Sequence, residues 1–182
     1  MVRPSQGRST SKKDIDGSEL LLNTELQNHE YTSRLAIVEA LPIAYSTKIK
    51  VGDEVLVHHN VFRRFRDIRG DEKNSKSYFS ENMFFVQPDQ VYAYKRNGKW
   101  YCLSGFCFIK PIINKNKFSL RKEQEAIGII KYASDNFNVG ELVGFKPGSE
   151  YEFNIEGERL YRVPSNRITI KYEYQGNEEE YN

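Results

Sequence analysis

Hydrophobic residues in this 182-residue chain recur in short runs with the two-residue period of β-strands. Residues 168–172, for example, alternate apolar with polar positions. Residues 91–94 and 100–103 flank Asn97-Gly98, a dipeptide that favours a type I′ hairpin turn because both of its residues need a positive φ. Helical periodicity is nearly absent, with a weak turn or two at residues 120–126. The pattern therefore predicts an all-β chain.

A diverged internal repeat is the most informative feature of the sequence. The matching segments, in chain order, are 35–38 with 127–130, 50–57 with 138–145, and 86–91 with 163–168. The middle pair reads Lys-Val-Gly-Asp-Glu-Val-Leu-Val and Asn-Val-Gly-Glu-Leu-Val-Gly-Phe, at an offset of 88 residues. The last pair has an offset of 77 residues, so the first copy carries about 11 extra residues in its central loop. A Val-Gly-Asp turn alone marks many bulged strands, but three ordered matches indicate one β-unit used twice.

The repeat divides the chain into two units with a polar segment at each end. Residues 1–16 are predicted to be a disordered basic tail and residues 176–182 an acidic tail, because neither has a hydrophobic cluster to bury. The first unit covers residues 17–110 and contains an inserted Arg-rich loop, and the second covers residues 111–175. The segment Phe106-Cys-Phe-Ile-Lys-Pro111 either closes the first copy or opens the second.

The repeated unit resembles the subunit of the GroES-like co-chaperonins, the lids of double-ring chaperonins. That subunit is a small β-barrel with a Val-Gly-Asp turn between strands and a late hairpin that carries a glycine. The likeness rests on Lys50 to Val57 in the first copy, and on Val139 to Phe145 with Gly157-Glu-Arg-Leu-Tyr161 in the second. The sequence is more similar to divergent, phage-encoded relatives than to the bacterial form. The resemblance implies two tandem GroES-like small β-barrels.

The resemblance also implies a function in chaperonin-assisted protein folding. Family members assemble into a ring and cap a double-ring chaperonin through a long mobile loop, in which a glycine precedes an apolar tripeptide. Asp16-Gly-Ser-Glu-Leu-Leu-Leu-Asn23 lies at the corresponding place, so the chaperonin-binding residues would be Leu20, Leu21 and Leu22. Three consecutive leucines cannot all face one side of a strand or helix. The alternative is an edge strand with Leu20 and Leu22 turned inward.

Two units in one chain affect the expected ring. The family's ring has seven positions, and seven is odd, so paired units cannot fill it. Either one unit of each chain occupies a ring position, or the ring is not a simple seven-fold lid.

The inserted loop, residues 58–79, indicates a different function. It holds Arg63, Arg64 and Arg66 with the aromatic residues Phe62 and Phe65 interleaved. Cations that bind phosphate beside rings that stack on bases are typical of barrels that bind single-stranded nucleic acid. The same arginines could instead contact carboxylates of a neighbouring subunit, or the loop could be a solvated one whose rings pack on the barrel. A structural β-protein of a virion would need neither the loop nor the leucines.

Composition excludes several classes of protein. Lys and Arg number 27 against 25 Asp and Glu, so a net charge of +2 creates no overall field that requires nucleic acid or a membrane as partner. No apolar run approaches the roughly 18 residues of a transmembrane helix, and the N-terminus lacks the apolar region of a secretory signal. Cys102 and Cys107 are too few for a disulfide scaffold and suit a reducing compartment, so a cytoplasmic location is expected.

Catalytic and metal-binding patterns are not found in the sequence. No glycine-rich phosphate loop or nucleophile elbow occurs, so neither an enzyme nor a bound cofactor is expected. His58 and His59 are expected on a strand, where adjacent side chains point to opposite faces and cannot readily bind one metal ion.

Overall fold

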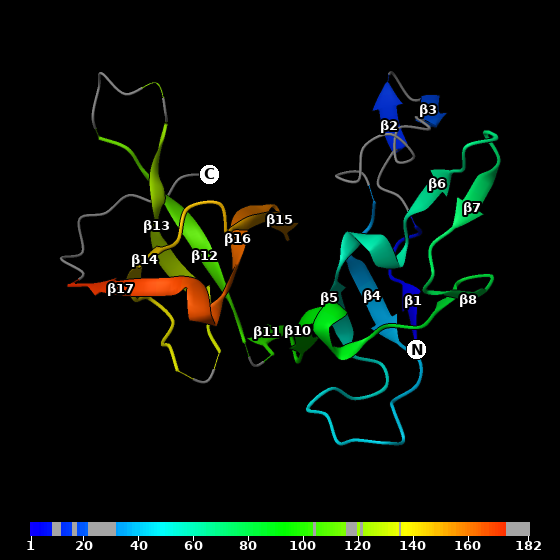
Figure 1. Cartoon of the computed structure of the whole chain (residues 1–182), viewed down its shortest axis with the longest axis horizontal. Helices are drawn as coiled ribbons and strands as arrows, with labels where there is room; N and C mark the ends of the chain where they lie inside the picture. Colours follow the sequence, from blue (N-terminus) through cyan, green and yellow to red (C-terminus); the bar gives the residue numbers. More distant parts are fainter. Residues whose placement is uncertain are drawn as a thin grey trace. The chain divides into compact units, whose positions relative to one another are not determined.

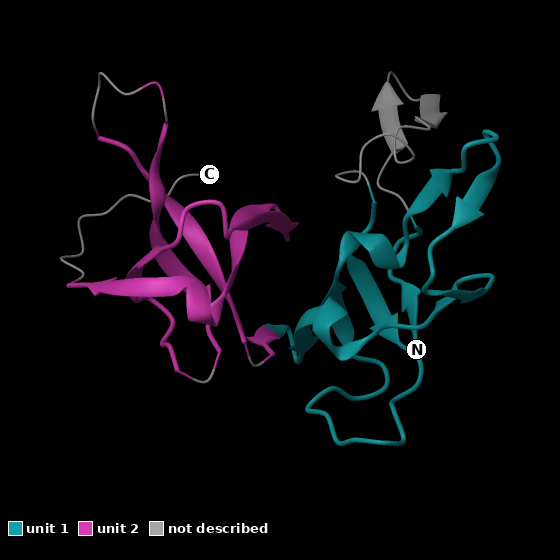
Figure 2. Cartoon of the chain, in the orientation of Figure 1, with its two compact units in different colours: residues 1–99 teal, residues 100–182 magenta. Residues whose placement is uncertain are grey.

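The computed structural model describes residues 1–8, 12–15, 18–21, 32–103, 105–115, 120, 122–134 and 136–173. The chain is all-β and forms two compact units, Met1–Lys99 and Trp100–Asn182 (Figure 2). The predicted boundary between residues 110 and 111 falls inside a strand, β12 (Phe106–Ile113), so the division lies earlier in the chain than the repeat indicated. Segment 106–111 therefore belongs to the second unit.

Unit 1 is built on a seven-stranded antiparallel sheet of order β11-β10-β5-β4-β1-β9-β8 (Figure 1). Its strands are β1 (Val2–Pro4), β4 (Leu35–Val38), β5 (Glu54–Val57), β8 (Tyr78–Ser80), β9 (Met83–Phe84), β10 (Val91–Arg96) and β11 (Lys99–Cys102). The division between the units falls within β11, after Lys99. The β10–β11 turn is the predicted Asn97-Gly98 pair, with φ of 52° and 75°. Two short hairpins complete the unit: β2 (Lys12–Ile15) with β3 (Ser18–Leu21), and β6 (Arg64–Arg66) with β7 (Glu72–Asn74).

Unit 2 is built on a six-stranded sheet of order β15-β16-β12-β13-β14-β17. Its other strands are β13 (Glu123–Tyr132), β14 (Leu142–Phe145), β15 (Tyr151–Ile155), β16 (Glu158–Pro164) and β17 (Ile168–Tyr172). The weak helical pattern at residues 120–126 was misleading, because β13 begins at Glu123. The helical elements described are short 3₁₀ turns: η2 (His59–Val61), η3 (Pro88–Gln90) and η4 (Ser165–Arg167).

The two sheets share one strand order and one register. The order β10-β5-β4-β1-β9-β8 in unit 1 corresponds to β17-β14-β13-β12-β16-β15 in unit 2. Val2 in β1 pairs with Val38 and Phe84. Ile109 in β12 pairs with Ile130 and Tyr161, which stand at the matching positions of the second copy. The internal repeat predicted from the sequence is therefore confirmed, and it extends to a first strand in each copy.

The first strand of unit 1 lies where a disordered tail was predicted. Val2 is 4% exposed, and the terminal amino group donates a hydrogen bond to the Ala40 carbonyl at 2.7 Å. A strand of three residues is too short to show alternation, and the polar run that follows Pro4 concealed it in the sequence. The prediction of a tail for residues 1–16 is thus wrong at its start.

The Val-Gly-Asp/Glu turn has the same geometry in both units. Gly52 has a φ of 87° and Gly140 a φ of 90°, a region that residues with a Cβ rarely adopt. The Gly52 N–H donates to the Val38 carbonyl and the Gly140 N–H to the Ile130 carbonyl, each at 2.8 Å. The motif recurs because this tight return from one strand to the next needs a glycine.

The acidic residue of each turn is held by a cation from the strand that pairs with the one after the turn, β10 in unit 1 and β17 in unit 2. In unit 1, Arg96 donates to both carboxylate oxygens of Asp53, at 2.5 and 3.1 Å. Burial raises the pKa of Asp53, but the hydrogen bonds from Arg96 and the Lys50 amide outweigh it and leave the pKa below its usual value. In unit 2, the hydrogen bond from Lys171 is the main reason why the pKa of Glu141 falls to about 2.

Stability is therefore expected to depend on Glu141 in acid. A carboxylate with a lowered folded pKa stabilises the protein above its unfolded pKa, near 4.5, and this contribution disappears as the pH falls toward 2. Glu141→Gln should lower the urea midpoint at pH 7, and the difference from wild type should shrink between pH 4 and 2. Glu81→Gln, an exposed control, should leave the midpoint unchanged. A Glu141→Gln deficit that is equally large at pH 2 and 7 would contradict this account.

Apolar side chains cover both faces of the unit 2 sheet. On one face lies a fully buried cluster of Cys107, Ile109, Ile130, Val143 and Val163. The neighbouring positions Ile129 and Leu142 turn to the other face and pack with Ile112. Cys102 and Cys107 are both free thiols, and burial raises the pKa of Cys102. These thiols therefore serve as packing residues.

Candidate functional site

The predicted chaperonin-binding segment lies in the connection between β1 and β4, and residues 9–31 are called the arm below. Arg8 and Ser33 lie on either side of the arm, and the Ser33 N–H donates a hydrogen bond to the Arg8 carbonyl at 3.1 Å. Within the arm, β2 and β3 form a hairpin in which Leu20 pairs with Lys13 and Leu21 with Lys12. Leu22 and the side chains of Leu20 and Leu21 lie outside the described residues.

Unit 2 has its own connection at the equivalent place, between β12 and β13. It spans residues 114–122, and its ends are joined by a hydrogen bond from the Asn114 N–H to the Lys122 carbonyl at 2.9 Å. It is shorter than the arm and mostly polar, and its Leu120 is fully exposed. The arm is therefore an elaboration of a connection that both units possess.

Arg8 fixes the root of the arm to the core of unit 1. Its guanidinium lies over the Phe84 ring, 5.0 Å from the centroid, and donates to the Phe62 carbonyl at 3.3 Å. Burial lowers the pKa of Arg8, and the nearby charge of Arg64 lowers it further. A cation–π contact and a partly buried hydrogen bond thus hold Arg8, the residue before the arm, on unit 1.

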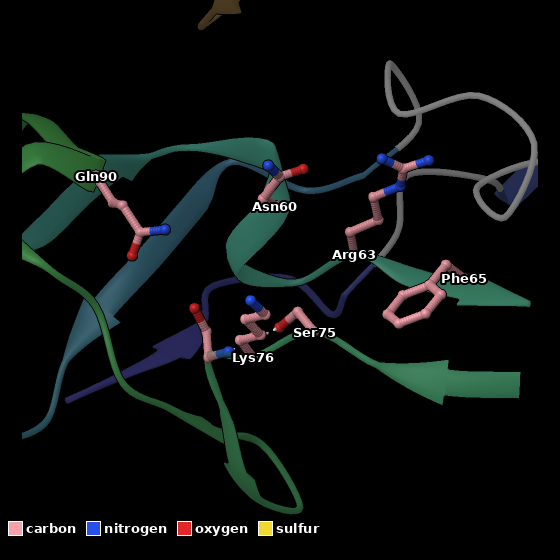
Figure 3. Close-up of a pocket in the computed structure, with 7 residues that line it drawn as sticks. Asn60, Arg63, Phe65, Ser75, Lys76 and Gln90 are labelled. Carbon is pink, nitrogen blue, oxygen red and sulfur yellow. Dashed lines mark hydrogen bonds between the residues drawn. The ribbon is translucent and has the colours of Figure 1, made fainter. Parts of the chain in front are cut away.

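The inserted loop forms the β6–β7 hairpin and one wall of a pocket of about 540 Å³ (Figure 3). Residues from three separate segments line this pocket, which is called the Arg63 pocket below: Asn60, Arg63, Phe65, Ser75, Lys76, Ser77 and Gln90. Asn60 belongs to η2, at the start of the inserted loop, and Gln90 belongs to η3, beyond its end. Lys76 is one of the cations of the Arg-rich loop that the sequence singles out, whereas nothing in the chain marks Asn60 and Gln90 as its neighbours.

Strand alternation separates the arginines that the sequence grouped together. Arg63 and Phe65 both line the pocket, as expected for positions two residues apart on an extended segment. Arg64 and Arg66 stand at the intervening positions and therefore face the other side of the hairpin. There Arg64 pairs with Glu72 at 2.7 Å, while Arg66 is exposed.

Phe62 does not belong to this surface. Its side chain is 1% exposed, and its ring meets that of Phe84 edge-on at a centroid distance of 4.9 Å. Phe62 is a core residue of unit 1, so Phe65, at 41% exposure, provides the accessible ring beside Arg63.

The two adjacent histidines are placed differently from the strand arrangement expected of them. His58 caps η2, where its Nδ1 accepts a hydrogen bond from the Asn60 N–H at 3.1 Å, and His59 begins that turn. Their rings lie on the same side, with centroids 4.2 Å apart, so the argument from opposite strand faces was wrong. Among the described residues, no group of three or more His, Cys, Asp or Glu side chains is arranged to hold a metal ion.

An ionic cluster on unit 2 links three strands through Arg159. This arginine donates to Glu152 and Glu123, each at 3.0 Å, and also to the Tyr161 hydroxyl. Burial raises the pKa of Tyr161, and its hydrogen bond to Glu123 raises it further. Because both carboxylates are paired with Arg159, the cluster joins β13, β15 and β16 rather than offering a base.

Comparisons with protein-family models, curated proteins and solved structures find no match for this chain. Within the described part of the chain, no helix has the length and apolar character needed to cross a membrane.

Proposed function

We propose that this protein is a co-chaperonin, a lid that closes the folding chamber of a double-ring chaperonin. The observation that carries the proposal is the two-fold use of one β-unit, with the arm in the first connection of the first copy. Each copy has the Val-Gly-Asp/Glu turn, and the second has the late glycine-bearing hairpin; the resemblance to GroES-like subunits rests on these segments. ATP hydrolysis would belong to the partner, and this chain would supply binding alone.

The arm is suited to bind with low affinity by itself and with high avidity as part of a ring. The residues that flank it, Arg8 and Ser33, are joined by a hydrogen bond, and the sequence between them carries Leu20 to Leu22. The resemblance implies a loop that becomes ordered on binding, and the loss of conformational entropy would keep the affinity of a single arm low. A ring of lids multiplies that affinity, because arms on one ring act at a high effective concentration.

Self-association is supported by a sheet edge that no described strand of unit 2 covers. The unit 1 strand β10 is paired on this side with β11, and Ala93 of β10 is fully buried. In unit 2 the equivalent strand, β17, is the last described strand of the sheet, and Ile170 at the position of Ala93 is 51% exposed. An apolar edge strand is a template for pairing with another chain.

This edge gives a direct test of oligomer formation. Ile170→Lys should shift the protein from a ring oligomer to a monomer in sedimentation-velocity experiments, because a charge would have to be buried at the interface. Ile43→Lys, at a fully exposed position of unit 1, is the matched control and should leave the oligomer intact. A wild-type protein that sediments as a monomer at all concentrations would refute the ring.

The function itself is tested by refolding. A denatured substrate enzyme that needs a lid for recovery is diluted into a bacterial double-ring chaperonin and ATP, with this protein in place of the usual lid. Substrate activity should rise well above that obtained with chaperonin and ATP alone. Leu120→Ser, which removes an exposed leucine from the equivalent connection of unit 2, should retain this effect. Recovery no better than with chaperonin alone would count against the lid.

A further inference from the structure

The carboxylates of the inserted loop do not neutralise the Arg63 pocket. Glu72 pairs with Arg64 on the other side of the hairpin. Asp67 accepts the amides of Arg69 and Asp71 at the hairpin tip, and Lys73 lies within 4.0 Å of the same two aspartates. Among the described residues that line the pocket none is acidic, and the two charged ones are Arg63 and Lys76. The pocket therefore carries a net positive charge.

The polar groups of the pocket are mostly hydrogen-bond donors. The Nε of Arg63 is buried and has no hydrogen-bond partner among the described residues. Gln90 uses its side-chain oxygen to accept the Gln87 N–H at 3.0 Å, which leaves its amide NH₂ as the outward group. Figure 3 shows Lys76 beside Ser75 on one segment and Arg63 on another, with the guanidinium directed away from Lys76, so each of two segments contributes one cation to the pocket lining.

An aromatic surface lies next to these donors. Phe65 stands two residues from Arg63 on the same face of the hairpin, and its ring is 41% exposed. Cations bind phosphate, whereas an exposed ring stacks on a base of any sequence. At about 540 Å³, the pocket is within the range of small-ligand sites.

We propose that the Arg63 pocket binds a nucleotide unit, with the phosphate attracted by the pocket's two cations, Arg63 and Lys76, and the base on Phe65. The unit belongs either to a free nucleotide or to a single-stranded nucleic acid, and the chemistry of recognition is the same. The described residues that line this pocket lie outside residues 9–31, so the proposal can be tested independently of chaperonin binding.

The test measures fluorescence anisotropy of a labelled oligothymidylate with the full-length protein, over a series of salt concentrations. Binding should weaken with salt, because each phosphate contact releases counterions. ATP and AMP are then added as competitors: displacement by either identifies a free nucleotide as sufficient, and binding of the oligonucleotide alone identifies the strand. Failure of the oligonucleotide, ATP and AMP to bind at low salt would overturn the proposal.

Matched variants separate this site from general charge attraction. Arg63→Gln with Lys76→Gln should weaken binding at least about tenfold and reduce the salt dependence. Arg66→Gln with Arg69→Gln removes the same charge from positions outside the pocket and should change affinity less than about twofold. Equal losses in both pairs would refute a specific pocket. If the first pair does not fold, Lys76→Gln alone repeats the test, because that side chain is exposed.

The base contact has a test of its own. Phe65→Ala should weaken oligonucleotide binding by about fivefold or more, as expected for the loss of one stacked base. Phe79→Ala removes another exposed ring, one that does not line the pocket, and should have little effect. A Phe65→Ala protein of unchanged affinity, with base-free polyphosphate binding as tightly as the oligonucleotide, would refute the nucleotide as ligand.

Discussion

Replacing Gly128 by alanine is expected to destabilise unit 2 by about 3 kcal/mol or more. Gly128 lies in β13 opposite Pro111 of β12, in the centre of the sheet. A Cβ at this position would lie 2.3 Å from the Lys110 carbonyl oxygen and 2.6 Å from Ile109 Cγ2. The Lys110 oxygen belongs to the backbone, so β12 and β13 would have to separate to make room.

The matching position of unit 1 is the natural control. Ala36 pairs with Pro4 as Gly128 pairs with Pro111, and its Cβ is accommodated and fully buried. Ala36→Gly should cost only about 1 kcal/mol. Hydrogen exchange with mass spectrometry resolves the two units, and Gly128→Ala should raise exchange mainly in residues 106–173. Wild-type protection of β12 and β13 in Gly128→Ala would contradict the close approach of these strands.

Replacing Leu20, Leu21 and Leu22 together by serine is expected to abolish chaperonin capping. The triple substitution removes the apolar tripeptide that the resemblance assigns to the chaperonin groove. Because ring avidity multiplies every arm, the loss in apparent affinity should be at least about 100-fold. The measurement is binding of the purified variant to immobilised chaperonin in the presence of ATP.

The triple variant also separates the two interpretations of these leucines. A lid contact predicts that the variant keeps its thermal unfolding temperature and circular dichroism spectrum while binding is lost. An edge strand packed on unit 1 predicts a lower unfolding temperature, and that result would move the leucines to the core. Leu120→Ser serves as the control for a loss of exposed apolar surface.

The repeat could be predicted because its matched segments are constrained by backbone geometry. Gly52 and Gly140 must adopt a positive φ, and the flanking valines alternate into a sheet, so both leave a pattern in the chain. The first strand of each copy left no such pattern. Val2–Pro4 has only three residues, and its counterpart in β12, Ile109-Lys-Pro111, is too short to be recognised by sequence comparison. The equivalence of these two strands is shown by their pairing, because β1 pairs with β4 as β12 pairs with β13.

The Arg63 pocket was predictable only in part. The interleaving of cations and rings indicated the right segment, and two of the five residues named, Arg63 and Phe65, line the pocket. The sequence could not show which side of the hairpin each residue faces, nor that Phe62 is directed into the core. Asn60 and Gln90 come from 3₁₀ turns, and their approach depends on how β5 and β10 pair.

The central claim, that this protein is a lid, is tested most directly by co-sedimentation with a bacterial double-ring chaperonin, with and without ATP, followed by negative-stain imaging. The account predicts association that depends on ATP, and a dome of additional density on the end of the chaperonin ring. A protein that stays in the supernatant under both conditions, with bare chaperonin rings in the images, would contradict it.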